Sequence, residues 1–309
     1  MSVDLSPIDA DLLKTLTDVH GIPDGAYNIR KDGELVVRNS SSNIEISTKS
    51  DHPGIDIKIK ENTKGERVYI PVIVSKAGLK DVVYNTFYIG DNADVTIIAG
   101  CGIHNDSHDA SEHDGIHSFY VGKHARVKYI ERHYGKGKGD GSRILNPVTK
   151  VYQEEGSFCE MELSQIGGVT STIRDTFAEI GEDAKLIINE KLLTDGDQVA
   201  TSNMDIQLLG NNSNVQVVSR SVAKDQSKQT FNPLVKGEAF CHGHVQCDAI
   251  IMGKASITAI PGIEAAHEDA QLIHEAAIGK IAGDQITKLM TLGLTEEEAE
   301  QEILDDFLS

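Results

Sequence analysis

Apolar and polar positions alternate in short runs between about residues 25 and 261, and this period of two predicts β-strands. A recurring unit, apolar-Gly-x-x-small-x-apolar-x-apolar, organises this region. It occurs at residues 89–97, 121–129, 180–188 and 209–217, with a contracted copy at 252–260 and a degenerate copy at 155–161. In each copy we expect the glycine to permit a backbone turn, two polar residues to lie in that turn, and the next strand to point alternate side chains inward. These inward residues are Val95 and Ile97, Val127 and Tyr129, Leu186 and Ile188, and Val215 and Val217.

The spacing of the copies determines the expected fold class. No helical stretch separates them, which excludes βαβ units. The copies recur about every 30 residues, as in a solenoid of stacked β-coils. A meander sandwich is the alternative, although its turns usually recur about every 8–12 residues. We therefore predict a mainly β protein with a right-handed parallel β-helix core, a short N-terminal helix and a C-terminal helical hairpin.

Both ends of the chain carry helix signals. At the N-terminus, Ser6 can cap a helix that starts at Pro7 and ends at Gly21. A hairpin turn is expected at residues 31–33, where Lys-Asp-Gly separates two β-like runs. The β-rich stretch is expected to end at Pro261. The expected divisions are an N-terminal helix (1–24), an N-terminal β region (25–88), the β-helix core (89–275) and a helical module (276–309).

The C-terminal module reads as two short helices. The first runs from Asp284 to Gly293, and a capping box from Thr295 to Glu298 starts the second. Such a hairpin could cover the end of the solenoid, or it could dock a partner through its apolar face.

Charge and composition narrow the function classes. The chain has 29 basic and 48 acidic residues, a net charge of −19, which argues against a nucleic-acid surface and against binding to an anionic bilayer. We expect neither a signal peptide nor a membrane span, and therefore a cytoplasmic protein. Its four cysteines would then be reduced.

Two groups of cysteine and histidine residues could bind metal or sulfur. In the first, Cys241, His242, His244 and Cys247 are close in sequence, and strand alternation would point both cysteines to one face. Alternatively, one cysteine packs in the core and the histidines lie exposed in a turn. The second group comprises Cys101, His104, His108, His113 and His117. Its Cys-x-x-His pattern resembles half of a zinc site, but the polar segment 108–117 reads as a solvated insertion.

Several motifs toward the C-terminus keep a fixed order and spacing. They are Gln246-Cys247-Asp248, Pro261-x-Ile263-Glu264, Ala270 to Ala276, Gly283-Asp284-Gln285, Leu292 to Ala299 and, further upstream, Gly122 to Tyr129. In these residues the chain resembles the SufB/SufD scaffold family of the SUF iron–sulfur cluster assembly system. The resemblance covers about residues 90 to 308.

The resemblance implies a parallel β-helix that forms a homodimer, or pairs with a related scaffold subunit, through its C-terminal end. It also implies that an ABC-type SUF ATPase docks on residues 284–309. Cys247, His274 and Glu275 match residues near the proposed cluster site, so a transient iron–sulfur cluster, or iron, is expected there and no permanent cofactor. One departure is Ala255, where SufB proteins carry a cysteine. The chain is then either a short homodimeric member or a SufD-like partner.

An enzymatic role is the alternative. No GxxxxGK[ST] motif, Ser-His-Asp set or Gly-x-Ser-x-Gly motif is evident, so ATPase activity is expected only in a partner and the chain is expected not to be an enzyme. The alternative function is that of a β-helix hydrolase or lyase acting on an extended polymer. The aromatic content of 5% disfavours it, because polymer-binding grooves rely on aromatic side chains.

Overall fold

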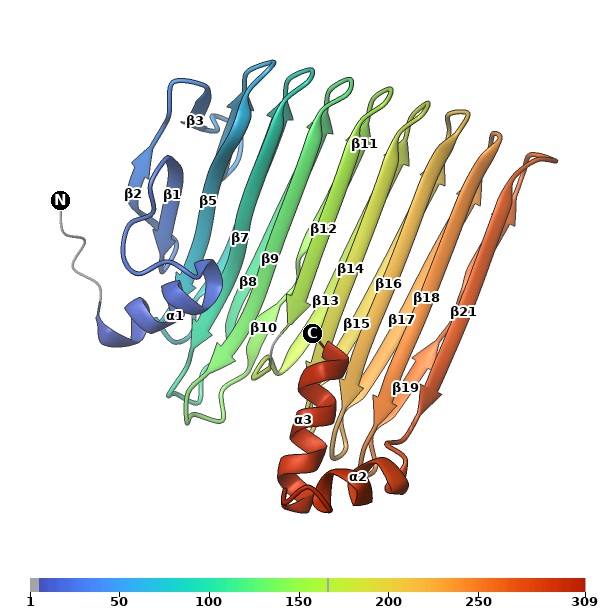
Figure 1. Ribbon diagram of the computed structural model, residues 1–309. Coiled ribbons are helices and arrows are strands. Elements are labelled where there is room, and N and C mark those ends of the chain that lie inside the picture. The colour runs from blue at the N-terminus through green and yellow to red at the C-terminus, as the bar shows by residue number, and fades with distance from the viewer. Residues whose placement is uncertain (1–5, 166, 309) are drawn as a thin grey trace.

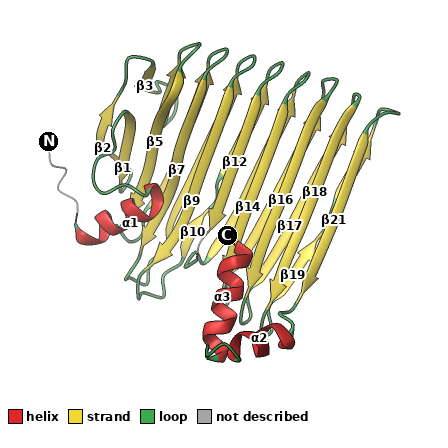
Figure 2. Ribbon diagram, in the orientation of Figure 1, coloured by secondary structure: helices red, strands yellow, loops and turns green. Residues whose placement is uncertain are grey.

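A computed structural model of the chain describes residues 6–165 and 167–308 (Figure 1). Residues 1–5 of the expected N-terminal segment lie outside the described residues. From residue 54 onward the chain alternates between two long sheets and adds one strand, or two short consecutive strands, to each in turn, so that every coil stacks on the previous one. The predicted mainly β fold with a parallel β-helix core is confirmed (Figure 2).

The first sheet, here sheet A, contains ten strands among the described residues. They are β1 Ala26–Lys31, β2 Glu34–Asn39, β5 Lys64–Val74, β7 Asp94–His104, β9 Arg126–Lys136, β12 Phe158–Gln165, β14 Lys185–Thr194, β16 Ser213–Ala223, β18 Cys241–Ile251 and β21 Gln271–Gly279. Their order is β2-β1-β5-β7-β9-β12-β14-β16-β18-β21. All neighbours are parallel except β1 and β2, which form the predicted hairpin. Its turn residues Asp32 and Gly33 have positive φ angles.

The second sheet, sheet B, contains the strands that alternate with those of sheet A. They are β3 Ile44–Thr48, β4 Gly54–Ile59, β6 Lys80–Ile89, β8 Ser111–Val121, β10 Arg143–Leu145, β11 Val148–Gln153, β13 Ser171–Ile180, β15 Val199–Leu208, β17 Lys228–Gly237, β19 Ser256–Ala259 and β20 Gly262–Ala265. The strands β10 and β11 together fill the place between β8 and β13, and β19 and β20 both pair with β17. Because β20 and β21 follow Pro261, the expectation that the β-rich stretch ends there is wrong.

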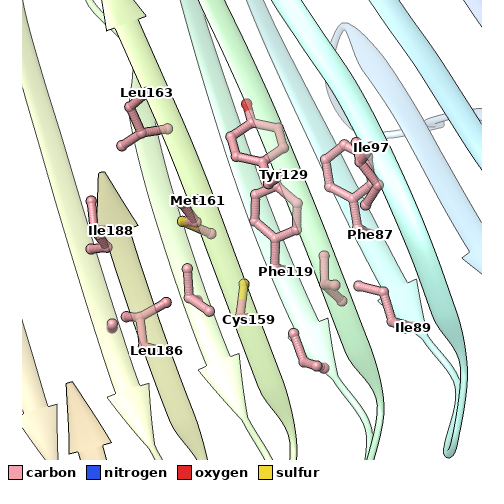
Figure 3. Close-up of a cluster of buried hydrophobic side chains, with 14 of the residues drawn as sticks. Phe87, Ile89, Ile97, Phe119, Tyr129, Cys159, Met161, Leu163, Leu186 and Ile188 are labelled. Carbon is pink, nitrogen blue, oxygen red and sulfur yellow. The ribbon is translucent and has the colours of Figure 1, made fainter. Parts of the chain in front are cut away.

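The core lies between the sheets and is built from aligned positions of successive coils. Val95, Val127, Cys159 and Leu186 occupy one row across sheet A and are all buried. The next row includes Ile97, Tyr129, Met161 and Ile188 (Figure 3). Every predicted inward residue of the repeat is buried. Strand alternation combined with an unbroken parallel register therefore produces the core.

The repeat glycines act through close packing in most copies. At Gly210 a Cβ atom would lie 2.1 Å from the backbone nitrogen of Glu182 on the preceding coil, and at Gly90 it would lie 2.5 Å from that of Glu61. Neither glycine has a positive φ. The left-handed conformation falls two residues later, on Asn92 and Asn212. The expectation that the glycine itself adopts a backbone conformation that other residues avoid is therefore wrong at Gly90 and Gly210. Glycine is required at these two positions because the backbone of the preceding coil leaves no room for a Cβ atom.

The N-terminal helix α1, Pro7–Thr17, lies on the outer face of sheet A against β5, β7 and β9. Ser6 caps it as predicted, in a reciprocal capping box with Asp9. It ends earlier than expected, because Asp18 adopts a left-handed conformation and closes the last turn before Gly21 is reached.

The C-terminal hairpin comprises α2 Gly283–Met290 and α3 Glu296–Leu308. The predicted capping box between Thr295 and Glu298 is present. The helices pack on each other, and the main contact of α3 with the solenoid is β16, in from the edge strand β21 (Figure 1). The contact of α3 is therefore with an inner strand of sheet A and not with the edge strand of the last coil. Among the described residues, no helix combines the length and apolar character needed to cross a bilayer.

Candidate functional site

The last two strands of sheet A position most of the predicted ligands. Alternation along β18 points Cys241 and Cys247 into the core, as predicted, and both are buried. Burial raises the pKa of Cys247 to about 11, and the carboxylates of Glu190 and Asp248 contribute. Burial also raises the pKa of Cys241. Both thiols are therefore protonated near neutral pH and would have to release a proton to bind a metal.

The histidines of β18 lie on the opposite face. His242 and His244 point out of sheet A and are partly exposed. The Nε2 atom of His244 lies 3.4 Å from a carboxylate oxygen of Glu275 on β21. His244 and Glu275 therefore form an external pair, and the sheet separates it and His242 from the two thiols.

His274 points inward on β21, opposite to its neighbour Glu275. It continues the buried row of Val217 and Val245 at the last coil. Its Nε2 atom is buried and has no hydrogen-bond partner. Burial lowers its pKa, with a further contribution from His244, so the imidazole is neutral and free to act as a ligand. The resemblance implied that His274 and Glu275 lie together near one site. In the structure their side chains lie on opposite faces of β21.

The end of the solenoid is an open edge. Among the residues that the structure describes, β21 is the last strand of sheet A and pairs with β18 alone. Its outward residue Ile273 is 56% exposed, and Ile278 is also exposed. Such an edge offers free backbone groups and apolar side chains to another strand. Ala255, at the position of the missing cysteine, lies in the turn before β19.

The structure does not bring together all members of the second predicted group of cysteine and histidine residues. Residues 111–117 belong to strand β8, so the expectation of a polar insertion over 108–117 is wrong for that part. Cys101, His113 and His117 line an internal cavity of about 10 Å³, enough for about one water molecule. His104 and His108 lie elsewhere and pair with Asp106 and Asp140.

Two further titratable residues line this cavity, Glu131 and His133 of β9, which no sequence motif marked. The Tyr129 hydroxyl lies 2.7 Å from Nδ1 of His117 and donates a hydrogen bond of 2.8 Å to Glu131. Arg174, from β13 of sheet B, contacts both Glu131 and His133. The only sequence signal was alternation along β9, which continues inward from Tyr129 to Glu131 and His133.

The polar interior extends toward the last coil. The Arg174 guanidinium lies 3.8 Å from Glu190 of β14. Glu190 accepts hydrogen bonds from Ser202 at 2.7 Å and from Ser219 at 2.9 Å. Ser219 is the register partner of Cys247. A chain of buried polar side chains thus connects the cavity with the coil that carries Cys247.

The charges in this interior are fixed by burial and by Arg174. Burial lowers the pKa of His117 to about 4 and that of His133 to about 3, so both are neutral. Burial alone would raise the pKa of Glu131, but Arg174 and then His133 hold it well below its usual range. Burial raises the pKa of the Cys101 thiol. Within the described part of the chain, no group of three or more His, Cys, Asp or Glu side chains is arranged to hold a metal ion.

The protein is thus a β-solenoid with a candidate ligand site at its open last coil. The site consists of the two inward thiols and the buried, unpartnered nitrogen of His274. The SufBD core domain of the SUF system for FeS cluster assembly matches residues 75–307. The chain therefore belongs to the SufBD family, as the resemblance implied.

Several relatives carry the same family description. An iron–sulfur cluster assembly SufBD family protein of Archaeoglobus fulgidus is 29% identical over 248 residues, which cover 79% of this chain and 66% of the relative. One of Methanocaldococcus jannaschii is 26% identical over 293 residues, covering 93% of this chain and 90% of the relative. The chain thus spans almost the full length of the second relative and slightly less than two thirds of the first.

Proposed function

We propose that the chain is a scaffold or scaffold-partner subunit on which an iron–sulfur cluster is assembled transiently, without a catalytic site of its own. Family membership supports a role in iron–sulfur cluster assembly. The observation that carries the proposal is the inward pair Cys247 and His274 at the open last coil, within the matched residues. Family membership gives no support to the alternative of a polymer hydrolase or lyase.

The proposed locus is the interior of the last coil. Cys247 supplies a thiolate and His274 an unpartnered imidazole, both suited to iron–sulfur chemistry. Cys241 reaches the same interior from the start of β18. Glu275, His242 and His244 lie on the other face, so any iron that they bind would be separate from this locus. We propose no metal role for Cys101, His104 or His117, because they lie on β7 and β8, several coils from the open last coil, and both histidines hydrogen-bond neighbouring side chains.

Substitutions at this locus are expected to reduce cluster retention. Cys247→Ser and His274→Ala should each lower the iron and sulfide retained after anaerobic reconstitution by about tenfold or more, because each removes a ligand. Cys159→Ala is the matched control, since Cys159 is buried in the same interior several coils away. Unchanged retention in both ligand variants would show that the locus lies elsewhere.

The second element of the proposal is docking of an ABC-type SUF ATPase on residues 284–309. On this module Leu292 is 77% exposed and Met290 is also exposed, which supports an apolar docking surface. Truncation after Gly283, or the single change Leu292→Asp, is expected to weaken binding of the purified ATPase by at least tenfold in calorimetry. Leu35→Asp, at an exposed leucine of β2, is the control. Equal binding by the truncated chain would exclude this module as the docking site.

The third element is pairing with a second copy, or with a related scaffold subunit, through the open edge at β21. The exposed Ile273 and Ile278 and the unpaired edge support it. We further propose that the assembly works in the cytoplasm, where reduced thiols persist. Sedimentation of the purified chain separates the two pairings: a stable monomer excludes the homodimer and leaves the related subunit.

A further inference from the structure

The outer face of sheet B carries a stack of exposed tyrosines. Tyr88, Tyr120 and Tyr152 occupy one row across β6, β8 and β11, and we call them the tyrosine ladder. The rings of Tyr88 and Tyr120 stack at 5.5 Å between centroids, and those of Tyr120 and Tyr152 at 5.0 Å. Tyr88 and Tyr120 are 43% and 46% exposed. The main helix contacts are made with sheet A, by α1 and by α3, so this face of sheet B remains open to a partner.

The ladder stops abruptly at Tyr152. The next position in the row, on β13, is Glu179, whose side chain has no ring to continue the stack. The nearest aromatic residue on that strand, Phe177, is tilted by 56° with its centroid 5.9 Å from that of Tyr152. Beside this position lies a hollow of about 160 Å³. Its lining consists of Tyr120, Val121, Tyr152, Gln153, Glu154, Glu179, Gly181 and Leu209.

The hollow is lined by two carboxylates and by no basic side chain. The carboxylates of Glu154 and Glu179 line it, and neither forms an ion pair or side-chain hydrogen bond with any described residue. Lys123, on the adjacent turn, is paired with Glu155 at 3.0 Å. Lys150 lies on the same face of β11 but does not line the hollow. With a net charge of −19 on the whole chain, the complementary ligand is a cation.

We propose that the hollow at the end of the tyrosine ladder receives an arginine side chain of a partner protein. The guanidinium is planar, so it can lie on Tyr152 as the next layer of the stack and direct its N–H groups at Glu179 and Glu154. Its aliphatic stem would then contact Leu209, which is exposed at the rim. A lysine ammonium would supply charge but no stacking plane. This inference does not depend on the proposed role in cluster assembly.

Fluorine labels on tyrosine test arginine binding directly, because the ladder itself consists of tyrosines. The chain contains eight tyrosines, so the labelled protein gives few signals. Fluorine NMR of the full chain labelled with 3-fluorotyrosine is recorded during titration with a blocked Gly-Arg-Gly peptide. The same titration is made with the citrulline peptide, which is neutral but isosteric, and with the lysine peptide. We expect the Tyr120 and Tyr152 signals to shift with arginine, with an affinity about two- to fivefold above that for lysine and no saturation by citrulline.

Two variants make the test specific. Glu179→Gln keeps the shape of the hollow and should weaken arginine binding about two- to fivefold. Tyr84→Leu removes an exposed tyrosine of β6 outside the ladder and should leave binding unchanged. Equal shifts with citrulline, equal affinity for lysine, the absence of any shift, or a shift with an oligosaccharide but not with arginine would each overturn the proposal.

Discussion

Replacing Arg174 with methionine is expected to lower the free energy of unfolding by about 4 kcal/mol. Arg174 is buried between the carboxylates of Glu131 and Glu190 and also donates a hydrogen bond to His133. Without it, two carboxylates remain in the interior with no countercharge, and the stack of coils must either hold a buried negative charge or protonate it. Urea unfolding followed by circular dichroism measures the loss.

Two further variants separate charge from packing. Adding Glu131→Gln to Arg174→Met should restore part of the lost stability, because it removes one of the stranded charges. Lys123→Met breaks the exposed pair with Glu155 and should change the unfolding midpoint little. If Arg174→Met behaves like Lys123→Met, the buried pair does not stabilise the solenoid.

The fold could be predicted because the repeat carries its own geometry. Each copy of the repeat predicts a turn, a strand and two inward side chains. The same coil is therefore predicted several times along one sequence. The polar interior could not be predicted in the same way. Glu131 and Arg174 are 43 residues apart, and they meet only because β9 and β13 face each other across the core. No local pattern encodes such a contact between sheets.

The candidate site was partly predictable. Cys241 and Cys247 were expected on one face, and both point inward. His274 and Glu275 were treated as one group, although neighbours in a strand point to opposite faces. That error followed from ending the β-rich stretch at Pro261, because residues 271–279 were then not recognised as a strand. His274 has a buried nitrogen without a hydrogen-bond partner, which only the packed structure reveals. His104 also has one, but its other ring nitrogen pairs with Asp106 and it lies far from the last coil.

Acidification is expected to destabilise the protein between about pH 6.5 and pH 4 through His117 and His133. Both imidazoles are buried and neutral, with pKa values of about 4 and about 3 in the folded state against 6.5 ordinarily. Because the folded pKa values are depressed, the unfolded chain binds protons first as the pH falls, and stability is lost below pH 6.5. Each histidine should remove about 3 kcal/mol by pH 4.

The corresponding variants identify the source of this pH dependence. In His133→Asn and His117→Asn the unfolding free energy should fall less steeply with pH, by about 1.4 kcal/mol per pH unit for each histidine removed. The window is distinct from that of Glu131, whose ordinary pKa is 4.5 and whose folded pKa is lower, so its contribution is lost only at more acidic pH. His108→Gln, at an exposed histidine of the loop before β8, is the control for a histidine outside the buried interior. Parallel pH profiles for the wild-type chain and both buried-histidine variants would show that these imidazoles are not protonated on unfolding in this range, and that the interior is more hydrated than its packing indicates.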